Sequence, residues 1–281
     1  MTAKIINGKE IAKNIRQSLK EKISLLKTPP ALAVILAGSD PASEIYVKNK
    51  EKACHEVGIT ARTHKFPANV SEKELLDLIN DLNRTPDING ILVQLPLPAH
   101  INSEKILQAV SPAKDVDGFH PLNTGLLQQK SPDTFIPCTP KGIIRLLHSL
   151  SLDLTGLNAV VIGRSQIVGL PVSNLLLQEN CTVTVTHSKT QNLSALCRSA
   201  DILIAALGKP EFITKEYIKP SAIIIDVGIN RTPNSLKGDV RLKDALDTAA
   251  YVTPVPGGVG PMTIAMLLEN TFEAFLKQNR P

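Results

Sequence analysis

The sequence predicts an α/β fold of two domains, each built on a parallel sheet covered by helices. Short runs that are apolar on both faces alternate along the chain with helix-forming stretches, and this alternation is typical of parallel strands joined by helical crossovers. A proline-punctuated segment at 132–140 interrupts the alternation, which restarts at Asn158. We therefore place an N-terminal α/β domain at 1–138, joined by a terminal helix at 262–281, and a C-terminal domain at 139–261. The length of 281 residues allows each domain its own core.

The N-terminal domain starts with a predicted amphipathic helix. Apolar residues recur at helical spacing from Ile11 to Ile23 among lysines and glutamates, and the Pro29-Pro30 pair follows the helix. The later elements are a strand at 31–37, a helix at 43–57 closed by Gly58, a strand at 63–66, a helix at 71–82 and a buried strand at 90–97.

The C-terminal domain repeats this pattern after a helix that Thr139 and Pro140 cap and that runs to about Leu150. The predicted strands lie at 159–163, 182–187, 201–207 and 222–228, with helices after Val168 and at 192–200. A final helix from Met262 to Leu276 carries apolar residues on one side, so we expect it to pack on the N-terminal domain.

Composition excludes several classes of protein. The net charge of +5 comes without a basic stripe and with only 3% aromatic residues, which argues against a nucleic-acid partner. The four cysteines form no CxxC pair, so we expect reduced core thiols and no metal site. Charged residues at the N-terminus and the lack of an apolar run near ~18 residues predict a soluble, cytoplasmic protein without a membrane partner.

A glycine-containing turn at 163–169 follows a predicted strand and opens a helix. Backbone amides and the helix N-terminus at such a turn can bind a pyrophosphate, which indicates a dinucleotide site in a Rossmann-like domain. Two of the three glycines of the GxGxxG pattern are present, and Ser165 replaces the middle one. The alternative is an ordinary strand-to-helix turn, against which the cation of Arg164 argues.

The end of the next strand indicates which dinucleotide binds. NAD enzymes place an acidic residue there to bind the ribose, whereas this chain has His187, Ser188, Lys189 and Thr190. Hydroxyl groups and a cation, together with Arg164, can receive a 2′-phosphate, so we predict NADP as the cofactor. The alternative is a solvated turn.

Tyr46 and Lys50 are candidate catalytic residues. They are spaced i, i+4 on the predicted helix after the first buried strand, so both side chains lie on one face near the carboxyl end of that strand. The alternative is that Lys48, Lys50 and Lys52 form a run of charges on a face exposed to solvent. A short-chain dehydrogenase has the same Tyr and Lys spacing, but there the pair follows the glycine turn, and here it precedes the turn.

Three further segments stand out. Gln94 is a polar residue near the end of a buried strand, where it is either part of a site or a hydrogen-bonded core amide. Asp115 and Asp117 precede a glycine and could form a site or only a turn. The Pro-Gly-rich segment 253–263 is the third, and its Pro256-Gly257-Gly258 is either a ligand loop or a rigid loop without a ligand.

Eight ordered motifs extend over nearly the whole chain, and together they resemble the bifunctional methylenetetrahydrofolate dehydrogenase/methenyltetrahydrofolate cyclohydrolase family. One departure is Leu126, where the family usually has Arg. The motifs are GSDPASEIYVKNKEKACHEVGI, ILVQLPLP, KDVDGFHP, PCTPKG, GRSQIVGLP, HSKT, DVGIN and PVPGGVGPMT.

The resemblance implies two α/β domains flanking a cleft, a homodimer, and two successive reactions in one-carbon metabolism. 5,10-Methylenetetrahydrofolate is oxidised with NADP to the methenyl form, which water then opens to 10-formyltetrahydrofolate. It implies that Lys50 is the central catalytic residue, with Tyr46 positioning it, Gln94 hydrogen-bonding it and Asp117 binding the pterin. The other implied contacts are to NADP for Gly163, Arg164, Ser165, Ser188, Ile229 and Thr139, and to folate for Tyr46, Lys50, Gln94, Asp117, Pro256, Gly257 and Gly258.

The residue chemistry agrees with these roles. A lysine that transfers protons near neutral pH needs a lowered pKa, which burial beside a cationic substrate produces. Gln94 can orient such an amine without holding it protonated, and Asp117 offers two acceptor oxygens to adjacent pterin donors. Two alternatives are a monofunctional NADP dehydrogenase and a nucleotide-sensing protein without catalysis.

Overall fold

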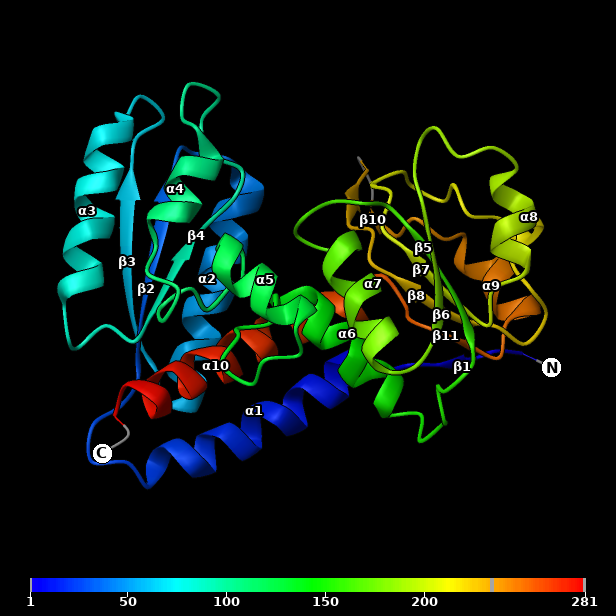
Figure 1. Cartoon of the computed structure of the whole chain (residues 1–281), viewed down its shortest axis with the longest axis horizontal. Helices are drawn as coiled ribbons and strands as arrows, with labels where there is room; N and C mark the ends of the chain where they lie inside the picture. Colours follow the sequence, from blue (N-terminus) through cyan, green and yellow to red (C-terminus); the bar gives the residue numbers. More distant parts are fainter. Residues whose placement is uncertain (1, 233–234, 280–281) are drawn as a thin grey trace. The chain divides into compact units, whose positions relative to one another are not determined.

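The computed structural model describes residues 2–232 and 235–279, and these form two compact units (Figure 1). One unit comprises Met1–Ala12 and Thr139–Thr263, and we call it the six-stranded unit. The other comprises Lys13–Cys138 and Ile264–Pro281, and we call it the three-stranded unit. Each contains a parallel sheet with helices, so the predicted α/β class is confirmed.

The three-stranded unit is built on a parallel sheet in the order β3-β2-β4. The central strand is buried along its whole length and pairs with both neighbours. The strands are β2 (Ala31–Ala37), β3 (Thr60–Phe66) and β4 (Gly90–Val93), and the helices are α1 (Gly8–Ser24), α2 (Pro41–Val57), α3 (Glu72–Arg84), α4 (Ser103–Ala109), α5 (Pro121–Gln128) and α10 (Val259–Gln278).

Local capping explains where α2 begins and ends. Asp40 precedes the helix and accepts a hydrogen bond from the Ser43 amide at 2.7 Å, while Pro41 occupies the first helical position. Gly58 ends the helix in the left-handed conformation at φ 87°. The helix therefore starts two residues before the predicted position and ends at the predicted one.

The predicted strand at 90–97 is too long. The observed strand β4 ends at Val93, and the Gln94 amide donates the last bond toward the sheet, to the Ile35 carbonyl at 2.9 Å. Pro96 has no N–H to contribute to a ladder, which explains why pairing does not continue. Gln94 consequently lies just beyond the carboxyl end of a strand, and not within it.

The six-stranded unit contains a parallel sheet in the order β1-β11-β8-β7-β5-β6. A separate antiparallel pair joins β9 (Asn230–Arg231) to β10 (Leu236–Lys237). The sheet strands are β1 (Lys4–Ile5), β5 (Asn158–Ile162), β6 (Thr182–Thr186), β7 (Ile202–Ala205), β8 (Ile223–Asp226) and β11 (Tyr251–Val252), and the helices are α6 (Cys138–His148), α7 (Gly169–Gln178), α8 (Leu193–Arg198), η1 (Lys215–Tyr217) and α9 (Leu242–Thr248).

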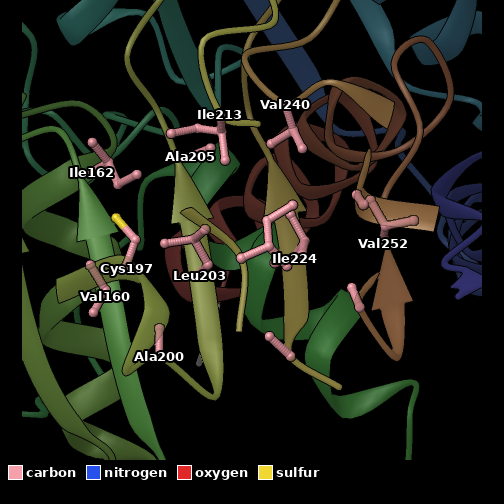
Figure 2. Close-up of a cluster of buried hydrophobic side chains, with 14 of the residues drawn as sticks. Val160, Ile162, Cys197, Ala200, Leu203, Ala205, Ile213, Ile224, Val240 and Val252 are labelled. Carbon is pink, nitrogen blue, oxygen red and sulfur yellow. The ribbon is translucent and has the colours of Figure 1, made fainter. Parts of the chain in front are cut away.

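Aliphatic side chains fill the core on one face of this sheet, as the absence of Trp requires (Figure 2). Val160, Leu203 and Ile224 project from three neighbouring strands, and Val240 and Val252 extend the cluster. All five are at most 4% exposed, so the sheet is sealed on this face.

Residues 2–12 fall in the six-stranded unit, whereas the sequence pattern predicts them in the N-terminal domain. Strand β1 pairs in parallel with β11, with Lys4 beside Tyr251 and Ile5 beside Val252. Strands of two residues are too short to show a hydrophobic period, which is why β1, β9, β10 and β11 had no sequence signal.

The terminal helix α10 packs in the three-stranded unit from Ile264 onward, as expected. Asn270 donates to the Val116 carbonyl at 2.8 Å, and Gln278 donates to the Asn89 carbonyl at 2.8 Å. Residues 280–281 of the predicted helix lie outside the described residues. Among the helices of 2–232 and 235–279, none is long and apolar enough to cross a membrane.

Candidate functional site

Three segments of the three-stranded unit end at one edge of its sheet. Strand β2 leads into α2, β4 leads into Gln94, and Asp115 forms a parallel bridge with Ile91 of β4 before the chain reaches Asp117. The carboxyl ends of parallel strands are where ligands bind in open α/β sheets. This topology brings Lys50, Gln94 and Asp117 to the same edge.

Lys50 is buried although it lies on a helix rich in charge. Its exposure is 5%, whereas Lys48 and Lys52 on either side are exposed, so Lys50 does not belong to a solvated charge run. Its Nζ donates to Gln94 Oε1 at 3.0 Å and lies 4.9 Å from the centre of the Tyr46 ring. The structure therefore brings together three of the predicted site residues.

Helix geometry and a second hydrogen bond fix this arrangement. Side chains of a helix lean toward its N-terminus, so Lys50 reaches back toward the strand ends from the middle of α2. Gln94 Nε2 donates to the Leu95 carbonyl at 2.7 Å, which leaves Oε1 to face the amine. The amide is thus held as an acceptor for Lys50.

Burial lowers the pKa of Lys50, because the charged amine loses its hydration. The charge of Asp117 opposes this shift, and Cys138 and Cys54 oppose it more weakly. The direct partner of the amine, Gln94, is neutral and adds no ion pair. The lysine is consequently easier to deprotonate than an exposed one.

The two aspartates of the KDVDGFHP motif have different roles. Asp115 accepts the amides of Gly118 at 3.1 Å, Phe119 at 3.2 Å and His120 at 2.8 Å. Asn123 Nδ2 donates to it at 2.8 Å as well. These four donors make Asp115 the carboxylate that shapes the loop.

Asp117 lies beside Lys50 at the sheet edge. Burial raises the pKa of Asp117, the charge of Lys50 lowers it, Asp115 raises it and a hydrogen bond with Cys138 lowers it. Gly118 after it has φ +72°, and a Cβ there would be 2.5 Å from the Phe135 carbonyl oxygen, so only glycine allows this close packing.

Sequence reasoning missed Cys138 and Asn270 as supports of this site. Cys138 is 1% exposed, hydrogen-bonds Asp117 and donates to the Val116 carbonyl at 3.4 Å. Asn270 is fully buried and donates to the Val116 and Ile136 carbonyls at 2.8 and 2.9 Å. A polar Asn among the apolar residues of the last helix was the available signal. All four cysteines are free and buried, as predicted.

The glycine turn of the six-stranded unit follows β5, which lies between β6 and β7 in the sheet. The chain continues from β5 to β6 on one side and later to β7 on the other side, which makes this edge the topological switch point. Gly163 has φ +124°, and a Cβ there would lie 2.3 Å from the Ala206 carbonyl oxygen. A Cβ at Gly169 would lie 2.2 Å from the Gly163 carbonyl oxygen. Neither position can therefore hold a residue with a side chain unless the backbone moves.

Ser165, which replaces the middle glycine of the pattern, caps the start of the following helix. Its Oγ accepts the amides of Val168 at 3.2 Å and Gly169 at 3.3 Å, and these are amides at the start of α7. Arg164 and Ser165 are exposed, so both are accessible to an anion. The turn thus offers a cation and a helix N-terminus together.

The other residues assigned to the cofactor lie in the same unit. Ser188 is exposed after β6, in a turn that the His187 amide closes by donating to Thr190 Oγ1 at 2.9 Å. Ile229 is 53% exposed after β8. Thr139 Oγ1 lies 2.8 Å from Thr263 Oγ1, so its hydroxyl already has a partner.

The loop of Pro256, Gly257 and Gly258 also belongs to this unit. Gly257 has φ +109°, and its carbonyl accepts the Lys9 amide at 2.9 Å. A Cβ at Gly258 would be 2.7 Å from the Pro254 carbonyl oxygen. The glycines therefore permit a tight loop that the start of α1 holds.

The residues present fit NADP. Gly163 and Gly169 let the turn fold tightly at the start of α7, where a pyrophosphate can bind to the backbone, and exposed Arg164 and Ser188 suit a further phosphate. A parallel α/β fold with this turn at its switch point, and a separate buried lysine at a strand edge, defines a dinucleotide-dependent α/β enzyme. Two family descriptions narrow this class.

Residues 6–117 match the family model of the tetrahydrofolate dehydrogenase/cyclohydrolase catalytic domain. Residues 137–279 match the family model of the tetrahydrofolate dehydrogenase/cyclohydrolase NAD(P)-binding domain. The chain belongs to the tetrahydrofolate dehydrogenase/cyclohydrolase family. The resemblance seen in its motifs is thereby confirmed.

Relatives match over almost the full length. The bifunctional protein FolD of Acetivibrio thermocellus is 52% identical over 98% of this chain and 97% of the relative. The crystal structure of the Campylobacter jejuni bifunctional FolD is 46% identical, with a TM-score of 0.95 over 97% of this chain and 98% of that chain. The Trypanosoma brucei FolD structure, complexed with NADP and an inhibitor, is 38% identical, with a TM-score of 0.96 over 100% of both chains.

Proposed function

We propose that this chain carries out both reactions of its family on one folate. It oxidises 5,10-methylenetetrahydrofolate to 5,10-methenyltetrahydrofolate with NADP and hydrolyses the product to 10-formyltetrahydrofolate. The observation that carries the assignment of residues is the buried Lys50 amine on the neutral acceptor Gln94, beside Asp117. This set supplies a proton acceptor and a fixed partner that orients it.

Lys50 serves the hydrolytic step. As the oxygen of water bonds to the methenyl carbon, one of its protons passes to the neutral Nζ. The bond between that carbon and N5 then breaks, its electron pair stays on N5, and N5 takes up a proton. The carbon becomes the formyl group on N10, and the whole step releases one proton. Gln94 holds Nζ in place during these transfers through the 3.0 Å hydrogen bond.

Asp117 and Tyr46 bind and orient the folate. Two carboxylate oxygens of Asp117 match the adjacent ring N–H and amino donors of a pterin. The Tyr46 ring next to the Lys50 amine provides an apolar surface for the substrate and positions the amine. On the resemblance alone, we also assign Pro256, Gly257 and Gly258 to folate binding.

NADP is held by residues of the six-stranded unit and, when bound, supplies the acceptor for the hydride of the methylene group. The backbone at Gly163 and Ser165 binds its pyrophosphate, and Arg164 with Ser188 binds the 2′-phosphate. Ile229 and Thr139 line the remainder of the site. The six-stranded unit is accordingly the NADP-binding domain, and the three-stranded unit is the folate-binding domain.

The proposal includes a homodimer in the cytoplasm. The resemblance carries the homodimer, and the charged N-terminus carries the location, which four free, buried thiols also fit. Sedimentation of the purified chain at twice its monomer mass tests the dimer.

One coupled assay tests the function. Purified chain is given 5,10-methylenetetrahydrofolate and NADP, and the absorbance of NADPH and of the methenyl form is followed together. The expected result is NADPH formation with 10-formyltetrahydrofolate as final product. If the methenyl form accumulates and disappears only at its spontaneous rate of hydrolysis, the chain is a monofunctional dehydrogenase. If no NADPH forms, the chain is a non-catalytic nucleotide binder.

A further inference from the structure

The six-stranded unit contains two buried carboxylates that no step of the reaction uses. Asp226 ends β8 and is 3% exposed, and Asp239, three residues after the start of β10, is fully buried. The two side chains lie at the carboxyl edge of the sheet. Burying carboxylates is costly unless donors surround them, so their hydrogen bonds indicate what they do.

Asp239 gathers the loop that follows β7. Its Oδ2 accepts the Leu207 amide at 2.6 Å and the Gly208 amide at 2.9 Å, and its Oδ1 accepts the Lys209 amide at 2.8 Å. Three consecutive backbone N–H groups thus converge on one carboxylate. The residue just before them, Ala206, is the one whose carbonyl oxygen contacts the glycine turn at Gly163.

Asp239 also holds the segment after β8. Asn230 Nδ2 donates to Asp239 Oδ1 at 2.9 Å. The Gly228 amide donates to Asp226 Oδ1 at 3.0 Å, so Ile229 lies between two anchored residues. Its 53% exposed side chain is therefore presented from a backbone that is fixed on both sides.

Asp226 in turn positions Asp239. Its Oδ1 accepts the Asp239 amide and its Oδ2 accepts the Val240 amide, both at 2.9 Å. Glycines let the two carboxylates approach the backbone. A Cβ at Gly238 would lie 1.8 Å from Asp226 Oδ2, and one at Gly228 would lie 2.3 Å from Asp239 Oδ1. Neither glycine can be replaced without displacing a carboxylate.

We propose that Asp239 is a positioning residue for NADP binding, because it fixes the two loops at the carboxyl ends of β7 and β8 against the glycine turn. The inference rests on the proposed function, since it assumes that NADP binds at this edge. Burial raises the pKa of Asp226 to about 7, so a protonated Asp226 can stand beside Asp239 without charge repulsion.

Asp201 provides a matched control at the opposite edge of the same sheet. Its carboxylate also joins two segments, since it accepts the Asn158 amide at 2.9 Å and the Lys219 amine at 2.6 Å. The Asn158 amide lies at the amino end of β5, away from the glycine turn. Asp201→Asn therefore removes a structural carboxylate without changing the cofactor edge.

The test compares Asp239→Asn, Asp201→Asn and the unaltered chain. The dissociation constant of NADPH is measured by calorimetry, and hydrolysis of methenyltetrahydrofolate is measured without NADP. Losing two or more charge-assisted hydrogen bonds should raise the NADPH dissociation constant of Asp239→Asn roughly tenfold or more. Hydrolysis should stay unchanged, and Asp201→Asn should bind NADPH normally.

Unchanged NADPH affinity in a folded Asp239→Asn variant would overturn the proposal, as would an equal loss in both variants. If Asp239→Asn does not fold, Asn230→Ala gives the decision, because it leaves the carboxylate in place and removes its link to the Ile229 segment, together with one longer hydrogen bond to the Lys237 carbonyl at 3.3 Å. Weaker NADPH binding by Asn230→Ala supports the proposal, and unchanged binding overturns it. Failure of the proposed function is recognised separately, since the unaltered chain would then bind no NADPH or hydrolyse no methenyltetrahydrofolate.

Discussion

Lys50 donates a hydrogen bond from Nζ to Oε1 of Gln94 at 3.0 Å, and this acceptor carries no charge. A carboxylate at the same position would form a buried ion pair and stabilise the protonated amine. The amide orients the amine and leaves the lowering of its pKa by burial intact. A neutral residue at position 94 therefore leaves the pKa of Lys50 lowered by burial.

Gln94→Glu should shift the pH dependence of hydrolysis. The new carboxylate raises the pKa of Lys50, and because the neutral amine is the active form, the activity limb on the acid side moves to higher pH. The cyclohydrolase rate measured across pH checks this. Gln94→Met is the control, since it removes the hydrogen bond without adding charge; it should lower the rate without that upward shift. A Gln94→Glu profile identical to that of the unaltered chain would contradict the proposed protonation state.

Substitution of Asp117 should affect folate binding, whereas substitution of Asp115 should affect stability. Asp117→Ala should raise the KM for folate about tenfold or more, because two pterin hydrogen bonds to a charged group are lost. Asp115→Ala leaves four donors without their acceptor and should lower the free energy of unfolding by on the order of 3 kcal/mol. Kinetics and denaturant unfolding of both variants check this, and an unchanged folate KM in Asp117→Ala would remove its role in binding.

Arg164 should determine the preference for NADP. Arg164→Ala is expected to lower kcat/KM with NADP roughly 10–100-fold, because a charge-assisted phosphate contact is lost, and to leave kcat/KM with NAD nearly unchanged. Arg198→Ala, which alters an exposed arginine bonded to the Glu216 carbonyl in the same unit, should change neither value. Equal kcat/KM with NAD and NADP in the unaltered chain would show that the 2′-phosphate is not recognised.

Asp226 should make stability fall as pH rises. Its pKa is raised from 3.8 to about 7 by burial, so the folded chain binds a proton that the unfolded chain releases between these values. The free energy of unfolding then decreases with pH in this window, by roughly 1.4 kcal/mol per pH unit from this group. Unfolding of Asp226→Asn should lack this contribution, while Asp201→Asn should keep it; identical slopes for Asp226→Asn and the unaltered chain between pH 4 and 7 would exclude it.

Strong local patterns made most of the fold predictable. The strand at 31–37 is entirely apolar and bounded by turn residues, and the structure reproduces its limits. The helix at 71–82 has its cap at Ser71 with Glu74 completing a capping box, and it runs on to Arg84. Strand β1 could not be predicted, because its pairing depends on β11, almost 250 residues away in the sequence.

The candidate site was predictable in its members and not in its supports. Lys50 and Gln94 were visible as a helical lysine and a polar residue near an apolar strand, and topology places them 3.0 Å apart. The different roles of Asp115 and Asp117 depend on which backbone amides of the loop point toward each carboxylate. The sequence does not specify this. Asp239 gave no signal for the same reason, since its partners come from three different segments of the chain.

The central claim is that Lys50 performs the hydrolytic chemistry, and Lys50→Met tests it most directly. Methionine keeps a similar unbranched length in the buried site and removes the amine. The account predicts that hydrolysis of methenyltetrahydrofolate falls by about 100-fold or more while the NADPH dissociation constant is unchanged. A Lys50→Met variant that hydrolyses methenyltetrahydrofolate at the full rate would contradict the account.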